Sequence, residues 1–276
     1  MAARSITCTN CGAPLEVHNP RAKICVCQFC GAQLDLTSPD YAFLGVVQRD
    51  PLIAPLQVGQ IATDDDGTKW RILGQIRFEE DGFHWDEWLL QAEDGRSFWI
   101  QYDDGRFSFY TPRRLTEPVD PLECTGTFEL GGKKHLCRDF GAASIQRIEG
   151  ELTWKAAVGQ TVRWLDAREV AMEWTERELE IFDVAPVSKG RIVQLFGMTR
   201  AELEAGCYLQ EDGDDWDSDD DGEDVLDQLG VTPPVKAMIY LIIVAVIVAF
   251  TIMDECGGIG GYHRGGYSSG GYSFGK

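Results

Sequence analysis

The chain has 276 residues, 44% of them hydrophobic, so it is long enough for one sizeable folded body with accessory segments. Its formal net charge of −20 argues against a surface that attracts nucleic acid as a whole. Nine cysteines, five of them between residues 8 and 30, form an odd and clustered set, which argues against a disulfide framework.

Two copies of the motif Cys-x-x-Cys-Gly lie near the start of the sequence. Cys8 and Cys11 form the first pair, and Cys27 and Cys30 form the second. Two thiolates three positions apart in a tight turn can bind one metal ion from the same side, and the glycine after each pair permits positive φ. Two such turns complete a tetrahedral four-thiolate site, for which Zn²⁺ is the usual ion. Because all four positions are filled, we predict a structural zinc site.

Two alternatives stay open at this motif. A redox-active Cys-x-x-Cys would lie on a helix after a strand, and not in twin turns. Cys25 could replace one ligand, although we expect it to lie on the strand before the second pair and to stay free. A fragment of this size cannot build an adequate core, so we expect metal to fold residues 1–36 as a zinc ribbon.

Short apolar segments separated by Asp-Gly pairs follow a proline-containing connector over residues 37–56. Asp-Gly between alternating segments is a strong hairpin signal. The pairs stand at residues 66–67, 81–82, 94–95 and 104–105. We predict successive strands over residues 69–73, 85–91, 98–102 and 107–110.

A second round of this pattern starts near residue 121. Glu149-Gly150 precedes Trp154 as Asp81-Gly82 precedes Trp85. The predicted fold class is therefore mainly β, with two related antiparallel units in a barrel-like or paired-sheet body. One continuous antiparallel sheet is the alternative.

The segment from Trp85 to Leu90, Trp-Asp-Glu-Trp-Leu-Leu, resembles the W-x-E-aromatic-x-L signature of the bacterial domain of unknown function 4178 family. A zinc ribbon before it and a membrane segment after it complete the likeness, which covers about residues 55–185. The second unit has Trp154-Lys-Ala-Ala and lacks the full signature. The resemblance implies β-rich modules linked to membrane-associated or stress-related bacterial systems, with no established catalytic role.

The β body shows no catalytic constellation. The four histidines are spread over four regions, and no Ser-His-Asp order, phosphate loop or H-E-x-x-H motif occurs. On a strand, His84 and Asp86 face one side and Glu87 the other, and we expect His84 and Asp86 at the surface. We expect the tryptophans in the core, with an exposed aromatic groove as the alternative.

The region after residue 190 combines a short helix with an acidic spacer. Thr199 and Glu202 predict a capping box. Residues 211–227 contain eleven acids and no base, which predicts an extended, self-repelling segment. Asp217, Asp219 and Asp221 fit the start of a calcium loop, but its twelfth position is Gln228 instead of Glu, so we expect at most weak calcium binding.

Residues 237–253, AMIYLIIVAVIVAFTIM, carry no charge, Gly or Pro. A helix of this length rises about 25 Å, which is within the range of membrane-spanning helices. A buried core helix or β-rich core segment is the alternative. No secretory signal peptide is evident, and reduced thiolate ligands belong in the cytosol, so we expect the bulk of the chain to be cytoplasmic. The Gly/Tyr-rich composition of residues 254–276 predicts a flexible tail.

These expectations define a domain plan and a function. The plan is a zinc ribbon (1–36), a linker (37–56), two β-units (57–120 and 121–190), a short helix with the acidic spacer (191–234), a transmembrane helix (235–253) and a disordered tail (254–276). We expect a non-enzymatic, tail-anchored adaptor or scaffold at the bacterial inner membrane, in a membrane-stress system and with protein partners. The alternatives are an accessory enzyme subunit that binds a small cationic substrate, and nucleic-acid binding by the ribbon, whose charge of about +1 includes Arg21 and Lys23.

Overall fold

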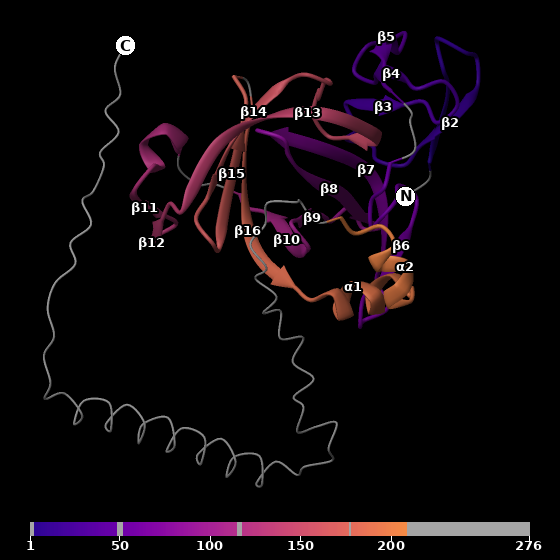
Figure 1. Cartoon of the computed structure of the whole chain (residues 1–276). Helices are drawn as coiled ribbons and strands as arrows, with labels where there is room; N and C mark the ends of the chain where they lie inside the picture. The colour runs from indigo at the N-terminus through magenta and orange to yellow at the C-terminus, as the bar shows by residue number, and fades with distance from the viewer. Residues whose placement is uncertain (1–2, 49–51, 115–117, 177, 209–276) are drawn as a thin grey trace, which may run out of the picture. The chain divides into compact units, whose positions relative to one another are not determined.

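The computed structural model describes residues 3–48, 52–114, 118–176 and 178–208 (Figure 1). Strands dominate this part of the chain, which confirms the mainly β fold class. The acidic segment, the apolar segment 237–253 and the Gly/Tyr-rich tail lie outside the described residues. Within the described ranges, no helix has the length and apolar character needed to cross a membrane.

Eight antiparallel strands close into a barrel. In order around the barrel they are β7 (Lys69–Glu80), β8 (Phe83–Ala92), β9 (Ser97–Asp103), β10 (Arg106–Pro112), β16 (Leu179–Val187), β15 (Val170–Trp174), β14 (Thr161–Asp166) and β13 (Asp139–Leu152). Strand β13 pairs back with β7, which closes the ring. Eight strands enclose an interior just wide enough for side chains to fill.

The barrel consists of two runs of four consecutive strands, β7 to β10 and β13 to β16. Tight turns with left-handed residues join the first run: Asp81 and Gly82 have φ of 52° and 90°, and Asp104 and Gly105 have φ of 43° and 82°. Such turns match the twist of paired strands, as the Asp-Gly pairs predict. Trp154 differs from its expected counterpart Trp85, because it lies in the β13–β14 connection and Trp85 lies in β8.

The closure of the barrel depends on a close backbone approach between β7 and β13. A Cβ atom on Gly74 would lie 2.2 Å from the carbonyl oxygen of Glu151, and one on Gly150 would lie 2.0 Å from that of Leu73. Neither distance is compatible with a side chain. Glycine is therefore required at both positions for the two strands to meet.

Residues 3–48, here called the head, add β3, β4 and β5 to the same sheet, whereas β1 and β2 pair only with each other. The head contains β1 (Arg4–Thr7), β2 (Pro14–Val17), β3 (Ile24–Val26), β4 (Ala32–Asp35) and β5 (Ala42–Val46). Strand β3 pairs with the end of β13, where Cys25 faces Glu151. The buried Glu151 carboxylate also accepts the backbone N–H groups of His18 and Asn19, each at 2.8 Å. Strand β5 lies within the predicted linker, so part of that linker adds to the sheet of the head.

Two short helices, α1 (Lys189–Phe196) and α2 (Arg200–Glu204), pack on the outer face of β7 to β10. They lie beside the short strand β6 (Ile61–Thr63). The capping box at Thr199 and Glu202 is confirmed at the start of α2. Ile192 and Leu203 pack from the helices against Trp88. On the opposite side, the 3₁₀ helix η1 (Pro121–Cys124) and the hairpin β11 (Thr127–Leu130) and β12 (Lys133–Leu136) contribute to a cluster with β14, β15 and β16.

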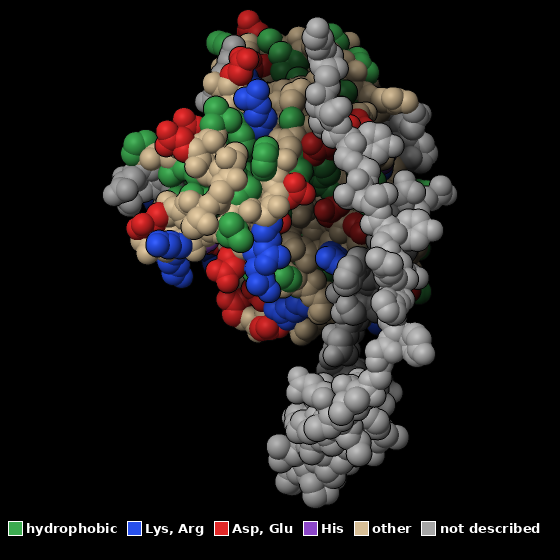
Figure 2. Space-filling model, turned by 60° about the vertical axis from the view of Figure 1, so that its left-hand side comes forward, with side chains coloured by type: hydrophobic (Ala, Val, Ile, Leu, Met, Phe, Trp, Pro, Cys, Tyr) green, Lys and Arg blue, Asp and Glu red, His purple; other side chains and the backbone are tan. Residues whose placement is uncertain are grey.

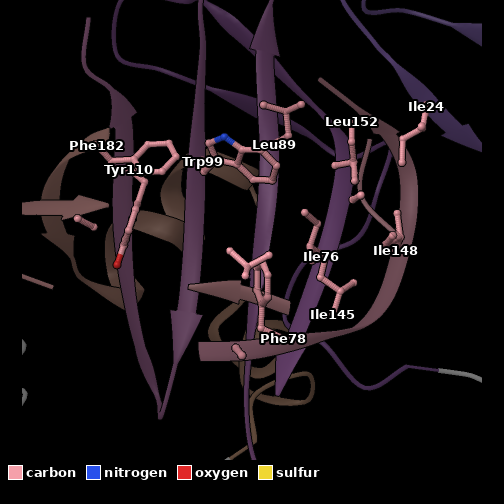
Figure 3. Packing of buried hydrophobic residues seen from close by; sticks show 14 residues of the cluster. Ile24, Ile76, Phe78, Leu89, Trp99, Tyr110, Ile145, Ile148, Leu152 and Phe182 are labelled. Atoms are coloured by element: carbon pink, nitrogen blue, oxygen red, sulfur yellow. The ribbon is translucent and has the colours of Figure 1, made fainter. Parts of the chain in front are cut away.

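The hydrophobic core of the barrel lies in its lumen. Figure 3 shows Ile76, Phe78, Leu89 and Trp99 pointing inward from β7, β8 and β9, with Tyr110 and Phe182 beside them. The rings of Tyr110 and Phe182 meet edge to face with centroids 5.6 Å apart. Apolar side chains fill this part of the lumen, and the lumen carboxyl group of Glu87 lies next to them.

Candidate metal centre and barrel lumen

The two Cys-x-x-Cys-Gly motifs form two turns of the same design in the head. The first turn joins β1 to β2, and the second joins β3 to β4. In each, the glycine after the second cysteine donates its N–H to the carbonyl of the first cysteine at 2.9 Å. Gly12 and Gly31 have φ of 76° and 73°, so the positive φ predicted from the motif is present in both.

The turns bring four sulfur atoms together. The Sγ atoms of Cys8, Cys11, Cys27 and Cys30 all lie within 4.8 Å of one another. Cys8 Sγ is 3.8 Å from Cys30 Sγ, and Cys11 Sγ is 3.8 Å from Cys27 Sγ. Four sulfurs placed tetrahedrally at about 2.3 Å from a zinc ion would be separated by about 3.8 Å. The cluster is therefore compatible with one tetrahedral metal ion.

Neighbouring hydrogen-bond donors favour the thiolate form of Cys30, and the thiolate is the form that binds metals. The side-chain amide of Asn10 donates to Cys30 Sγ at 3.4 Å. This bond, followed by one from the backbone of Ala32, lowers the pKa of Cys30 to about 6. Burial instead raises the pKa of Cys27, so metal binding would have to displace a proton there.

Cys25 lies on β3, paired with Leu34 and Glu151, and does not belong to the four-sulfur cluster. Its side chain is buried, and burial is the main cause that raises its pKa to about 12. A thiol in this setting behaves as a small apolar side chain.

The expected surface position of Asp86 is wrong. Asp86 is fully buried on the outer face of β8, under the chain that follows α2. Arg77 binds its carboxylate through two atoms, at 3.0 and 2.5 Å, and Gln75 and Tyr208 donate at 3.0 and 2.9 Å. The sequence pattern could not show that a distant residue such as Tyr208 covers this strand. His84, in contrast, is partly exposed.

Glu87, the neighbour of Asp86, points the other way, into the lumen. It is 4% exposed, and its Oε1 accepts hydrogen bonds from Trp85 Nε1 at 3.0 Å and Gln101 Nε2 at 3.3 Å. Tyr110 donates to Gln101 Oε1 at 2.9 Å, which orients that amide toward Glu87. Burial raises the pKa of Glu87 to about 7, although the two donors act in the opposite direction.

Two further glutamates face Glu87 from the other half of the barrel. Glu173 on β15 and Glu180 on β16 are opposite each other in the strand register. Burial, followed by repulsion from Glu87 and Glu180, raises the pKa of Glu173 well above its ordinary value. Burial also raises the pKa of Glu180, with a contribution from Glu178. Glu87, Glu173 and Glu180 therefore interact with one another in the lumen.

A cavity of about 100 Å³ opens beside this group. Its lining includes Trp85, Gln101, Tyr110, Trp164 and Glu173. A smaller cavity of about 20 Å³ is lined by Trp154, Glu178, Glu180 and again Glu173. Glu173 therefore lines both cavities.

Alternation along β8 separates Glu87 from Asp86, and this was predictable. The contact of Glu87 with Glu173 was not, because the two strands are far apart in the sequence and meet only in the closed barrel. The signal that could have identified them was a charged residue at an inward position of each strand, among aromatic neighbours.

Residues 57–189 match the family described as Domain of unknown function (DUF4178). This segment contains all eight barrel strands, and the match supports the resemblance carried by Trp85 to Leu90. The head, with its four cysteines, precedes the matched segment. No curated protein and no solved structure matches the chain.

Proposed function

We propose that Cys8, Cys11, Cys27 and Cys30 hold one structural Zn²⁺ ion, and that the head is a zinc ribbon. The observation that supports this most is the approach of four thiol sulfurs from two equivalent turns, at the spacing that tetrahedral zinc requires. Four protein ligands leave no open position for a substrate, so the ion stabilises the head and takes part in no reaction.

The metal analysis of the purified full-length chain tests this proposal. We expect one zinc per chain in the wild type, and less than a tenth of that in Cys8→Ser. Cys25→Ser is the matched control, because Cys25 is a buried cysteine of the same head outside the four-sulfur cluster, and it should retain zinc. A wild-type protein without zinc, or equal loss in both variants, would contradict the proposal.

The proposed role of the whole chain is that of a non-enzymatic adaptor or scaffold at the cytoplasmic face of the bacterial inner membrane, in a membrane-stress system. The apolar segment 237–253 would anchor it as a single-pass, tail-anchored protein. The acidic segment 211–227 would hold the barrel and head away from the membrane surface. The pairing of β3 with β13 favours a head and barrel that act together as one binding body.

Affinity purification from detergent-solubilised membranes tests the adaptor role. We expect specific protein partners with the full chain, and their loss when residues 237–253 are deleted, together with movement of the chain into the soluble fraction. A chain that stays in the membrane pellet after this deletion would contradict the anchor, and a full chain that recovers no protein would contradict the adaptor.

Nucleic-acid binding by the head is less well supported. Arg21 donates to the carbonyl of Gly95 at 2.9 Å, and Lys23 pairs with Glu178 at 2.5 Å, so both basic side chains contact other parts of the protein. Figure 2 shows acidic and basic side chains interspersed on the face in view, where a nucleic-acid site needs a continuous basic surface.

A further inference from the structure

The lumen of the barrel contains a group of acids, and among the described residues no ion pair joins Glu87 or Glu173 to a basic side chain. Glu87 and Glu173 lie close enough for their charges to interact, Glu180 lies near both, and Asp103 and Asp166 line the same cavity as Glu173. In the described part of the chain, no lysine or arginine lines the cavity of about 100 Å³ beside Glu173. The donors to Glu87, from Trp85 and Gln101, are uncharged. An ionised pair in this place lacks its counter-charge, and buried charges are normally paired.

The larger recesses of the protein differ in this respect. In the recess of about 520 Å³ between head and barrel, Arg147 pairs with Glu149. In that of about 830 Å³ beside Trp154, Lys23 pairs with Glu178 and Lys155 with Asp35. Both recesses have basic side chains in their lining, unlike the lumen cavity, so neither calls for a cationic ligand as the lumen does.

The walls of the lumen cavity indicate the kind of cation. Trp85 and Trp164 line it with their centroids 6.3 Å apart and their planes at 76°, and Tyr110 lines it as well. Aromatic faces attract organic cations, whereas Ca²⁺ needs six to eight oxygen ligands and Mg²⁺ an octahedron of them. A volume of about 100 Å³ corresponds to about three water molecules in the liquid, which matches a short alkyl chain with one ammonium group.

We propose that this cavity binds a small alkylammonium ion, with its charged group beside Glu173, where the charge of Glu87 adds to the attraction, and its alkyl chain against Trp85 and Trp164. Gln101 and Tyr110 are positioning residues, because the Tyr110 hydroxyl orients the Gln101 amide and the amide holds the Glu87 carboxylate. The proposal concerns binding alone and does not depend on the metal centre.

Titration of the full-length chain with ethylammonium chloride at pH 8 tests the proposal, with isothermal calorimetry as the readout. We expect saturable binding to one site in the wild type. The dissociation constant should rise at least tenfold in Glu173→Gln and in Glu87→Gln. Glu129→Gln is the control, since Glu129 is an exposed acid on β11, and it should bind as the wild type does. Tetraethylammonium, which is too large for the cavity, should not bind.

The wild type provides a second test that needs no variant. The titratable groups that face the ammonium position are Glu173, Asp103, Asp166 and Tyr110 in the cavity lining and Glu87 and Glu180 beside it, with Lys23 and Glu178 near Glu180. Because burial raises the pKa of Glu87 to about 7, ethylammonium should bind at least tenfold more weakly at pH 5.5 than at pH 8. Absence of binding in the wild type, unchanged affinity in folded Glu173→Gln, or affinity independent of pH would overturn the proposal. Binding of Mg²⁺ or Ca²⁺ at the same carboxyl groups in preference to ethylammonium would also overturn it.

Discussion

Asp86 and Glu87 are sequence neighbours that lie in opposite environments. Asp86 faces the outer side of β8 and is paired with Arg77, whereas Glu87 faces the lumen and interacts with another acid. Strand alternation accounts for the separation. Each carboxyl group is buried, so the partner that it meets decides its contribution to stability.

Replacing Glu87 should change how stability depends on pH. Its folded-state pKa is raised to about 7 from an unfolded value near 4.5, so the folded protein binds this proton more tightly. The contribution is fully present below pH 4.5 and is lost as the pH rises through 7. Between pH 5 and pH 8, urea unfolding should show the wild type losing up to about 3 kcal/mol relative to Glu87→Gln. An identical pH dependence in both proteins would contradict this assignment.

The ion pair of Asp86 with Arg77 should be worth far more than an exposed one. Asp86→Asn leaves the Arg77 guanidinium, 15% exposed, without its counter-charge, and we expect a loss of about 3 kcal/mol in the free energy of unfolding. Asp183→Asn removes the more exposed partner of Arg113 and should cost less than about 1 kcal/mol. Chemical denaturation of both variants checks the contrast, and equal losses would contradict it.

At the scale of elements, local signals predicted the strands that tight turns connect. Strands β7 to β10 occur where Asp-Gly pairs and alternating residues place them, and the capping box marks the start of α2. The closure of the barrel could not be predicted in this way, because the β7–β13 pairing joins segments about 70 residues apart through glycines that carry no pattern of their own. The four zinc-ligand candidates could be predicted because each pair is close in the sequence. The cluster of lumen acids could not, because Glu87 lies far from Glu173 and Glu180 in the sequence.

Gly74 provides a test of the closure. An alanine Cβ would lie 2.2 Å from the carbonyl oxygen of Glu151, so β7 and β13 would have to separate, and we expect Gly74→Ala to lose about 3 kcal/mol in the free energy of unfolding. Gly126→Ala is the matched control, because nothing lies within 4 Å of the added atom and the change should stay within about 0.5 kcal/mol. Thermal or urea unfolding of the two variants measures the difference. A fully stable Gly74→Ala protein would show that the strands can meet without this glycine.

At the scale of the whole molecule, the head and the barrel share one continuous sheet. Strand β3 extends β13, and Glu151 binds two backbone N–H groups of the head. Order imposed on the head by zinc would therefore reach the end of β13 directly. This continuity supports the proposal that head and barrel meet a partner as a single body, on the side of the membrane where thiolates stay reduced.

The orientation of this body at the membrane is tested most directly by the accessibility of an N-terminal epitope tag on the full-length chain. In inside-out inner-membrane vesicles, an antibody should bind the tag and protease should remove it. In intact spheroplasts the tag should be protected, and detergent should make it accessible. A tag exposed on intact spheroplasts would contradict the cytoplasmic placement, and with it both the reduced zinc site and the adaptor role.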